Sequence, residues 1–445
     1  MRDLFLITAI GLLCLATLRK PQVGILSWLW LSVMNPHKLS YGWITTFPLL
    51  DLVVAVTLLS AFINNKSMMK VRSHPILWML GLFYLWTTLT TVFSVVPDQA
   101  FEDWLNFTKT LLLVLMILLF MNSRHWTIAL IAVFILSIGF TGLKGGVFTV
   151  LTGGGNRVWG PPNTAWGDNN GVSVAMLMVL PMTLACRQLF QAKWLKNVVS
   201  GTTASFFFCL LGTQSRGGLV GFLGMLSFLV FRSNKKIISL ILAFIVLLAG
   251  YLMMPDSWHD RMDTIKNPTD RSSQTRLIQW QYAIDIAGER PFFGNGFDAY
   301  KYKPYYYKYV AHLDINRNVH SNYFQVLGDQ GYIGLAMYLI IGVSLVQVAH
   351  RHSKRVSHRR DLKWEKGALA AIQFSIVGFA FNGLTVNMAY LDLYYYLLTF
   401  VMLLSSQIRT QLERELPPPL VDGRFTPPDK PLAHRKEPMK VGPPQ

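Results

Sequence analysis

The sequence predicts an all-α protein, a polytopic bundle of about 12 transmembrane helices with one large, partly helical loop. Hydrophobic residues make up 52% of the 445 residues and charged residues only 14%, an apolar share above that of an ordinary soluble domain. Apolar runs of roughly bilayer length recur along the chain, and lysine and arginine concentrate in alternate connections between them. Together these observations predict repeated membrane crossings.

Each apolar run is expected to form a helix, because the runs lack the alternation of polar and apolar residues that barrel strands show. Several runs are shorter than the roughly 20 residues that a perpendicular helix needs, so those at the N-terminus are expected to be short, tilted or re-entrant. The runs fall at about 4–18, 21–34, 48–63, 76–95, 106–121, 126–144, 170–186, 198–213, 217–231, 237–254, 331–349, 368–387 and 389–406.

The first apolar run is followed by Arg19, Lys20 and Pro21 rather than by a small-residue cleavage site, so we expect it to be retained. The three cysteines, Cys14, Cys186 and Cys209, all lie inside predicted spans, where they act as small apolar residues. The sequence therefore predicts no disulfide and no metal site.

The formal net charge of +18 is distributed on one side of the predicted membrane. Alternate connections and the C-terminal tail hold 26 Lys and Arg against 7 Asp and Glu, and the rest of the chain holds 15 against 16. The positive-inside rule assigns the basic connections to the cytoplasm. The positive charge thus reflects topology, and no nucleic acid is expected as a partner.

Four parts follow from this map of spans and charges. Residues 1–254 form the N-terminal transmembrane helices, 255–330 an external loop, 331–406 the C-terminal transmembrane helices, and 407–445 a disordered cytoplasmic tail rich in proline. The map also places a glycine-rich loop near 145–168 on the outer side.

The external loop at 255–330 is too long for a simple connector and balances 9 Lys and Arg with 9 Asp and Glu. Its segment SSQTRLIQWQYAIDIAGERP has the apolar spacing of an amphipathic helix, which Pro291 would end. We expect this loop to carry the chemistry.

Several basic residues are predicted at the outer surface and suit a lipid diphosphate, because a guanidinium pairs bidentately with phosphate oxygens. Arg216, in TQSRGG, lies where two spans meet, and an ionised group near hydrocarbon depth is usually functional. Arg261 and Arg276 lie in the loop, and Lys144 and Arg157 flank the glycine-rich stretch. For the loop arginines, solvation or pairing with nearby aspartates is an equally open interpretation.

His320, in NVHSNYFQVLGDQGYIG, comes directly before an outward-to-inward span. A histidine there can accept a proton near neutral pH, as a general base for a sugar hydroxyl must. Taken alone, a histidine at a helix start is more often structural, so the catalytic interpretation of His320 depends on the surrounding motif.

These motifs resemble the O-antigen ligase superfamily. The resemblance rests on Arg216 in SRGGLVGF, on Trp280 with Pro291, Gly294 and Gly296, and on His320 in HSNYFQVLGDQG. SWLWLSVMNPHKLSYGW and the DNN at 168–170 further resemble a branch described as O-glycosylation ligases.

The resemblance implies a multi-pass enzyme of the bacterial inner membrane with its active site facing the periplasm. The donor would be a glycan on undecaprenyl diphosphate, and the acceptor a sugar hydroxyl of the lipid A core, in a metal-independent, inverting glycosyl transfer without a cofactor. His320 would be the general base. Arg216 would bind the departing diphosphate, with Arg276 as first choice and Arg261 as second choice for a further phosphate ligand.

Four other functions remain open. Within the superfamily, the chain could be an O-antigen polymerase or a protein O-oligosaccharyltransferase. A transporter of lipid-linked glycans fits less well, because Asp51, Lys109 and Asp392 lie near predicted span ends or are isolated, whereas a transporter places charges at midplane. A non-catalytic scaffold would not need His320.

Overall fold

A computed structural model of the chain describes residues 2–40, 42–65, 74–121, 123–263, 271–310 and 318–414. Over these residues the protein is all-helical and contains no strand, which confirms the predicted class. The N-terminal helices are α1 (Arg2–Arg19), α2 (Pro21–Met34), α3 (Leu49–Ile63), α4 (Pro75–Val92), α5 (Pro97–Phe120), α6 (Arg124–Leu151), α7 (Asn169–Cys186), α8 (Lys193–Gly212), α9 (Arg216–Arg232) and α10 (Lys236–Leu252). The later helices are α11 (Asp256–Asp263), α12 (Arg271–Glu289), α13 (Lys303–Tyr309), α14 (Asn322–Arg355), α15 (Lys363–Asn382) and α16 (Asp392–Arg414).

Five helical stretches in the described residues are long and apolar enough to cross a membrane: α4, α5, α6, Asn169–Leu189 and α14. The helices α2, α3 and α10 are apolar but shorter. Each predicted apolar run lies largely within a helix, but the run predicted at 368–387 extends too far, because α15 ends at Asn382. The predicted number of about 12 spans stays a prediction.

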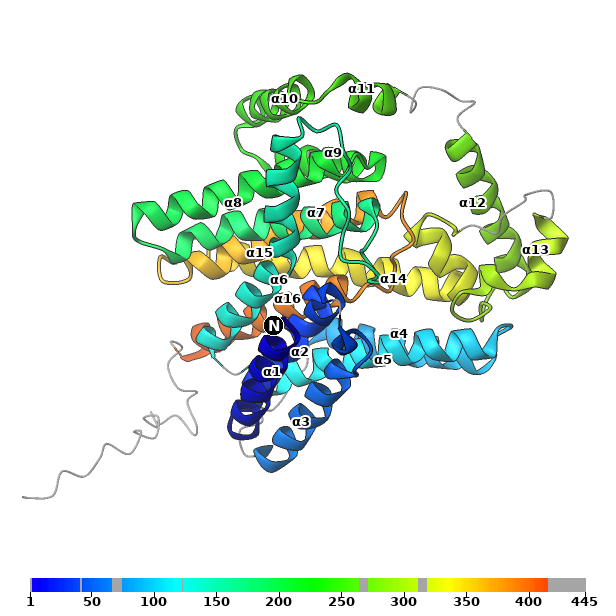
Figure 1. Cartoon of the computed structure of the whole chain (residues 1–445), viewed down its shortest axis with the longest axis horizontal. Helices are drawn as coiled ribbons and strands as arrows, with labels where there is room; N and C mark the ends of the chain where they lie inside the picture. Colours follow the sequence, from blue (N-terminus) through cyan, green and yellow to red (C-terminus); the bar gives the residue numbers. More distant parts are fainter. Residues whose placement is uncertain are drawn as a thin grey trace, which may run out of the picture.

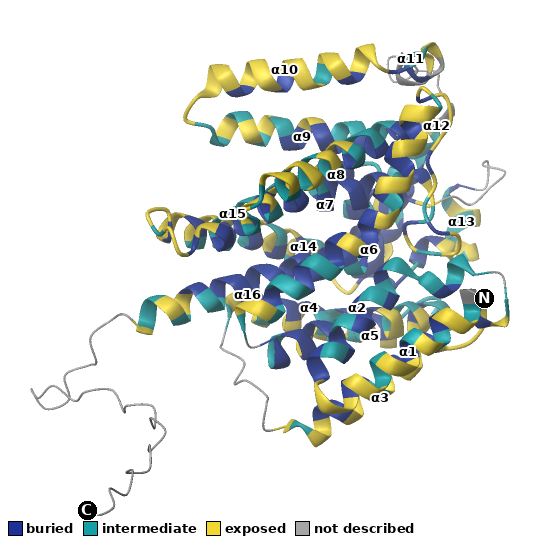
Figure 2. Cartoon of the chain, turned by 60° about the vertical axis from the view of Figure 1, so that its left-hand side comes forward, coloured by how far each residue is buried: buried dark blue, intermediate teal, exposed yellow. Residues whose placement is uncertain are grey.

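The outermost helices expose long apolar side chains, as a helix facing lipid must. On α10, Ile237 is 76% exposed, Leu240 60% and Phe244 62%, and Figure 2 shows α10 largely exposed at the edge of the molecule. Such a surface is unusual for a protein in water, because contiguous apolar patches are rare there. The burial pattern therefore supports a bundle immersed in a bilayer.

The predicted start of the glycine-rich loop at residue 145 is wrong, because α6 continues to Leu151. A Cβ on Gly142 would collide with Phe206 of α8, and one on Gly146 would collide with Ser205. These glycines let two helices approach closely, as small residues do between membrane helices. The irregular segment begins only after α6.

The predicted amphipathic helix of the external loop is confirmed as α12, which ends before Pro291. Figure 1 shows α12 and α13 together at one end of the bundle, where α14 begins. They share a small core of their own, built around Tyr282, Ile286, Tyr300 and Val319. The segment is thus folded against the bundle end.

A kink at Gly331 divides α14 into a short first part and a long second part. Gly331 has φ +68°, and a Cβ there would lie 2.7 Å from the carbonyl oxygens of Pro291 and Phe292. The Gln330 carbonyl at the kink accepts a hydrogen bond from Trp86 Nε1 at 3.0 Å. The kink coincides with the predicted boundary between loop and span, so glycine sets where the long helix starts.

The predicted start of the C-terminal tail at residue 407 is also displaced, because α16 continues to Arg414. Residues 415–445, which make up the rest of the predicted tail, lie outside the described residues.

Candidate functional site

The starts of α9 and α14 meet at the turn that follows α15, residues 382–385. The Asn322 backbone N–H donates to the Gly383 carbonyl at 2.8 Å, and Ser321 Oγ donates to the same oxygen at 3.4 Å. From α9, a Cβ on Gly217 would collide with the Thr385 hydroxyl. Arg216 and His320 each adjoin one of these contacts, so the structure places both at the same end of α15.

The backbone of Arg216 is held by a network of small polar side chains. Ser215 Oγ caps α9 by accepting from the Gly218 N–H at 3.0 Å and donates to Asn170 Oδ1 at 2.8 Å. Asn169 Nδ2 donates to the Thr213 carbonyl at 2.9 Å. Arg216, half-buried, is thus the first residue of α9, where a positive side chain opposes the helix dipole. Helix stability does not explain an arginine at this position.

His320 is half-buried and has φ +52°, a left-handed conformation that is uncommon for residues other than glycine. Such conformations persist where the surrounding structure enforces them and are frequent at active sites. Asn322 supplies part of this structure, because its Oδ1 also accepts from the Met388 N–H at 2.7 Å.

Two tyrosines fix the chain leading to His320. Tyr282 of α12 donates to the Tyr300 carbonyl at 3.1 Å, and Tyr300 donates to Asn318 Oδ1 at 3.1 Å. Burial raises the pKa of both phenols above their ordinary value, so both remain protonated donors. Asn318 lies two residues before His320, so α12 helps to position the histidine.

The helix α12 and the first part of α14 run in parallel, and this packing relates the position of Arg276 to that of His320. Trp280 stacks on Phe324 with ring centroids 5.3 Å apart, and further along both helices a Cβ on Gly328 would meet Ile286. Arg276 is four residues before Trp280, and His320 four residues before Phe324. The structure therefore places the Arg276 end of α12 on the same side of the stacked rings as His320.

Arg157 also lies near Arg216. Its Nε donates to Gln214 Oε1 at 3.3 Å, and Gln214 Nε2 donates to the Gly154 carbonyl at 3.0 Å. The irregular segment after α6 is thus tied to the turn that precedes Arg216.

Lys144 is not brought into this group. Lys144 is exposed on α6, about two turns before that helix ends. Arg261 belongs to α11, but its side chain lies outside the described residues.

A polar cavity of about 480 Å³ lies beside this region. Its wall includes Gln325, one turn after Asn322, and Gln325 Oε1 accepts from the Ala389 N–H at 3.0 Å. Carboxylates, amides and aromatic rings line the rest, among them Asp103, Asp298, Asn106, Asn387, Phe107, Trp166 and Tyr390. Hydrogen-bonding groups beside aromatic faces suit a ligand that is rich in hydroxyls.

Sequence reasoning did not identify the turn after α15 or this cavity. The turn reads NGLT, which is a turn signal without a chemical motif, and the residues that line the cavity come from six separate segments of the chain. Within the described residues, no group of three His, Cys, Asp or Glu side chains is placed to hold a metal ion.

Two family matches cover most of the chain. Residues 201–339 match the family described as O-antigen ligase, and these residues include Arg216, Arg276 and His320. Residues 1–191, which include Lys144 and Arg157, match a family of unknown function. No curated protein matches the chain.

Proposed function

We propose that this chain, which belongs to the O-antigen ligase superfamily through residues 201–339, transfers a glycan from undecaprenyl diphosphate to a sugar hydroxyl of the lipid A core. The observation that carries the proposal is the meeting of α9 and α14 at the turn after α15. One reaction centre can contain Arg216 and His320 only if both lie at the same end of the bundle.

In the proposed reaction, His320 accepts the proton of the acceptor hydroxyl as its oxygen attacks the anomeric carbon. The bond between that carbon and the diphosphate oxygen breaks, and undecaprenyl diphosphate leaves with the electron pair. Attack opposite the leaving group inverts the anomeric configuration. Arg216, Arg276 and Arg157 stabilise the charge that develops on the diphosphate.

The polar cavity supports a sugar substrate near this centre. Gln325 lines the cavity and belongs to the same helix start that His320 precedes. We assign the cavity to the glycan, whose hydroxyls the carboxylates and amides would bind. The location at the periplasmic face of the inner membrane is part of the same proposal.

The test is complementation of a ligase-deficient bacterial strain, scored by the O-antigen ladder of lipopolysaccharide on gels. The wild-type chain should restore the ladder, whereas His320→Ala and Arg216→Ala should not. Lys303→Ala, an exposed change on α13 outside the site, is the matched control and should restore it.

Other outcomes identify the alternatives. Longer glycans on the lipid carrier without a restored ladder would indicate a polymerase. A glycosylated pilin-like protein would indicate a protein O-oligosaccharyltransferase. An undiminished ladder with His320→Ala would remove this residue as the base.

A further inference from the structure

A second cavity, of about 1180 Å³, lies at the opposite end of the bundle from His320. It is bounded by the beginnings of α4, α6 and α15 and by the ends of α5, α14 and α16. The part of α14 after Gly331 separates the two sites by roughly 35 Å, which exceeds the thickness of the hydrocarbon core. This cavity therefore has no part in the proposed transfer.

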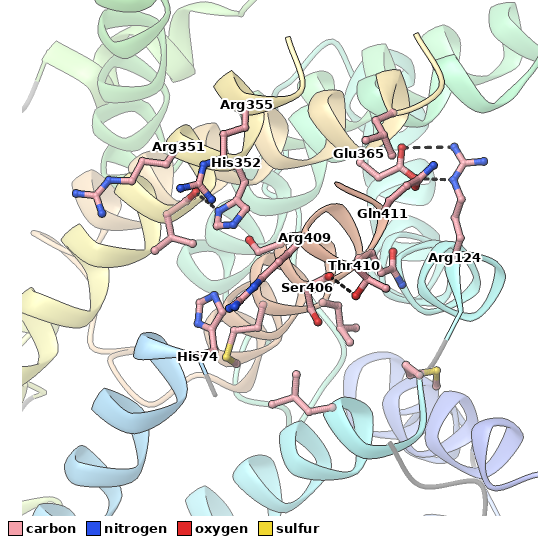
Figure 3. Close-up of a pocket in the computed structure, with 18 of the residues that line it drawn as sticks. His74, Arg124, Arg351, His352, Arg355, Glu365, Ser406, Arg409, Thr410 and Gln411 are labelled. Atoms are coloured by element: carbon pink, nitrogen blue, oxygen red, sulfur yellow. Dashed lines mark hydrogen bonds and ion pairs between the residues drawn. The ribbon is translucent and has the colours of Figure 1, made fainter. Parts of the chain in front are cut away.

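The cavity is strongly basic. Its lining contains five arginines and a single carboxylate, that of Glu365. Glu365 is already paired, since Arg124 Nε lies 2.5 Å from its Oε1, and Figure 3 shows this pair at one side of the cavity. Glu365 is therefore not available to neutralise the other arginines.

Figure 3 shows Arg351 and Arg355 on α14, with Arg409 of α16 close to His74. In the described part of the chain, no ion pair is found for Arg351 or Arg355, whereas Arg409 reaches Glu413 at 2.7 Å, one turn along its own helix. Basic residues at helix ends complement the helix dipole, but that role requires no cavity. Lys354, in the same turn of α14, is exposed and lies outside the cavity.

The cavity also offers an unpaired polar group and apolar walls. Ser405 is 1% exposed and lines the cavity, and its Oγ has no hydrogen-bond partner among the described residues. Leu77, Leu118 and Met402 supply apolar surface to the same cavity. A site with several guanidinium groups, a hydroxyl without a hydrogen-bond partner and an apolar wall matches a phosphate group carried on an apolar body.

We propose that this cavity binds a phosphate group through Arg351, Arg355 and Arg409. Two sources share this chemistry: the head group of an anionic phospholipid, and a free phosphate or diphosphate. The site lies at the membrane end that holds the basic connections, where anionic head groups are attracted by lysine and arginine.

The test is native mass spectrometry of the purified full chain in a neutral detergent. One arm adds dioleoyl phosphatidylglycerol with dioleoyl phosphatidylcholine as the uncharged reference, and the other adds inorganic phosphate or pyrophosphate. The double variant Arg351→Gln/Arg355→Gln should weaken binding by about tenfold or more, because each basic group near a phosphate contributes on this scale. The double variant Lys354→Gln/Lys235→Gln removes the same charge outside the cavity and should bind as the wild type does.

A cavity-dependent loss in the phospholipid arm assigns the site to a lipid head group, and the same loss in the phosphate arm alone assigns it to a soluble anion. Equal losses in the cavity and control variants, or binding that neither variant changes, would overturn the proposal. Arg351→Lys keeps the charge without the planar fork and should weaken binding less than Arg351→Gln, which checks the role of the guanidinium should the double variant fold poorly.

Discussion

At the residue scale, the positions of His320 and Arg216 depend on neighbouring residues that have no proposed catalytic role. His320 has a left-handed conformation, and hydrogen bonds of Tyr282 and Tyr300 hold the segment just before it. Arg216 comes directly after Ser215, whose hydroxyl caps α9. Sequence motifs identified both residues. The groups that orient them became visible only in the structure.

His320→Asn should lower the transfer rate by about 10²- to 10⁴-fold, because asparagine tolerates the left-handed conformation but offers no basic nitrogen. The measurement is transfer of a labelled glycan in proteoliposomes, with donor binding measured in parallel. Donor binding should stay near the wild-type value. A variant that binds donor and transfers at the wild-type rate would contradict the assignment of His320 as base.

At the element scale, close contacts between helices decide where the candidate residues lie. The parallel packing of α12 and α14 depends on Trp280 and Phe324, and the contact of α9 with the turn after α15 depends on Gly217. Each of these packing contacts orients a helix that carries, or directly follows, a candidate site residue.

Gly217→Ala should lower the free energy of unfolding by about 1–3 kcal/mol, because the added methyl group collides with the Thr385 hydroxyl. The measurement is the thermal unfolding midpoint in detergent. The double variant Gly217→Ala/Thr385→Ala removes the obstructing oxygen and should lose less than the sum of the two single changes. Additive losses would show that the two residues do not contact each other.

His74 should make stability depend on pH. Its Nδ1 caps α4 by accepting from the Ile76 N–H at 3.2 Å, which requires a neutral ring. Burial, with a smaller contribution from His352, lowers the pKa of His74 from 6.5 to about 4. The unfolded chain therefore takes up the proton first, and stability should fall as the pH drops from about 6.5 towards 4.

Urea unfolding in detergent over this pH range measures the effect. His74→Asn caps the helix without titrating, so its stability should fall less over the same interval. Equal pH dependence in the two proteins would exclude this histidine as the cause.

At the scale of the whole molecule, the two ends of the bundle carry different chemistry. The start of α14 contributes to the candidate active site, and its end contributes to the basic cavity. This separation predicts that the two ends of the bundle are exposed on opposite sides of the membrane.

In a variant whose three cysteines are replaced, single cysteines at Asn156, Asn318 and Ser357 should react differently with a membrane-impermeant maleimide. Asn156→Cys and Asn318→Cys, near Arg157 and His320, should react from outside intact cells. Ser357→Cys, just after α14, should react only after the membrane is opened. Labelling of Asn156→Cys and Asn318→Cys from opposite sides would rule out a shared reaction centre.

Transfer activity should persist in excess EDTA, because the proposed charge stabilisation relies on arginine and the proposed proton acceptor is His320. The measurement is the glycan transfer rate before and after dialysis against the chelator. A loss that added Mg²⁺ or Mn²⁺ restores would show that a metal ion takes part.

Local sequence patterns were sufficient for the all-helical class, for the amphipathic α12 and for the start of the long helix at Gly331. Apolar composition and helical periodicity involve only residues that are close in the sequence, so they can be recognised without knowledge of the tertiary structure. The same patterns misplaced the loop after residue 145, because glycine marks both turns and close helix contacts, and only the position of α8 distinguishes them.

By itself the sequence determined that the chain is a helical membrane protein with Arg216, Arg276 and His320 as candidates. Only the tertiary structure decided that these residues gather at one end of the bundle, that Lys144 does not join them, and that a basic cavity occupies the other end. Such proximity depends on contacts between residues far apart in the chain, such as Asn322 with Gly383, and no local pattern encodes them.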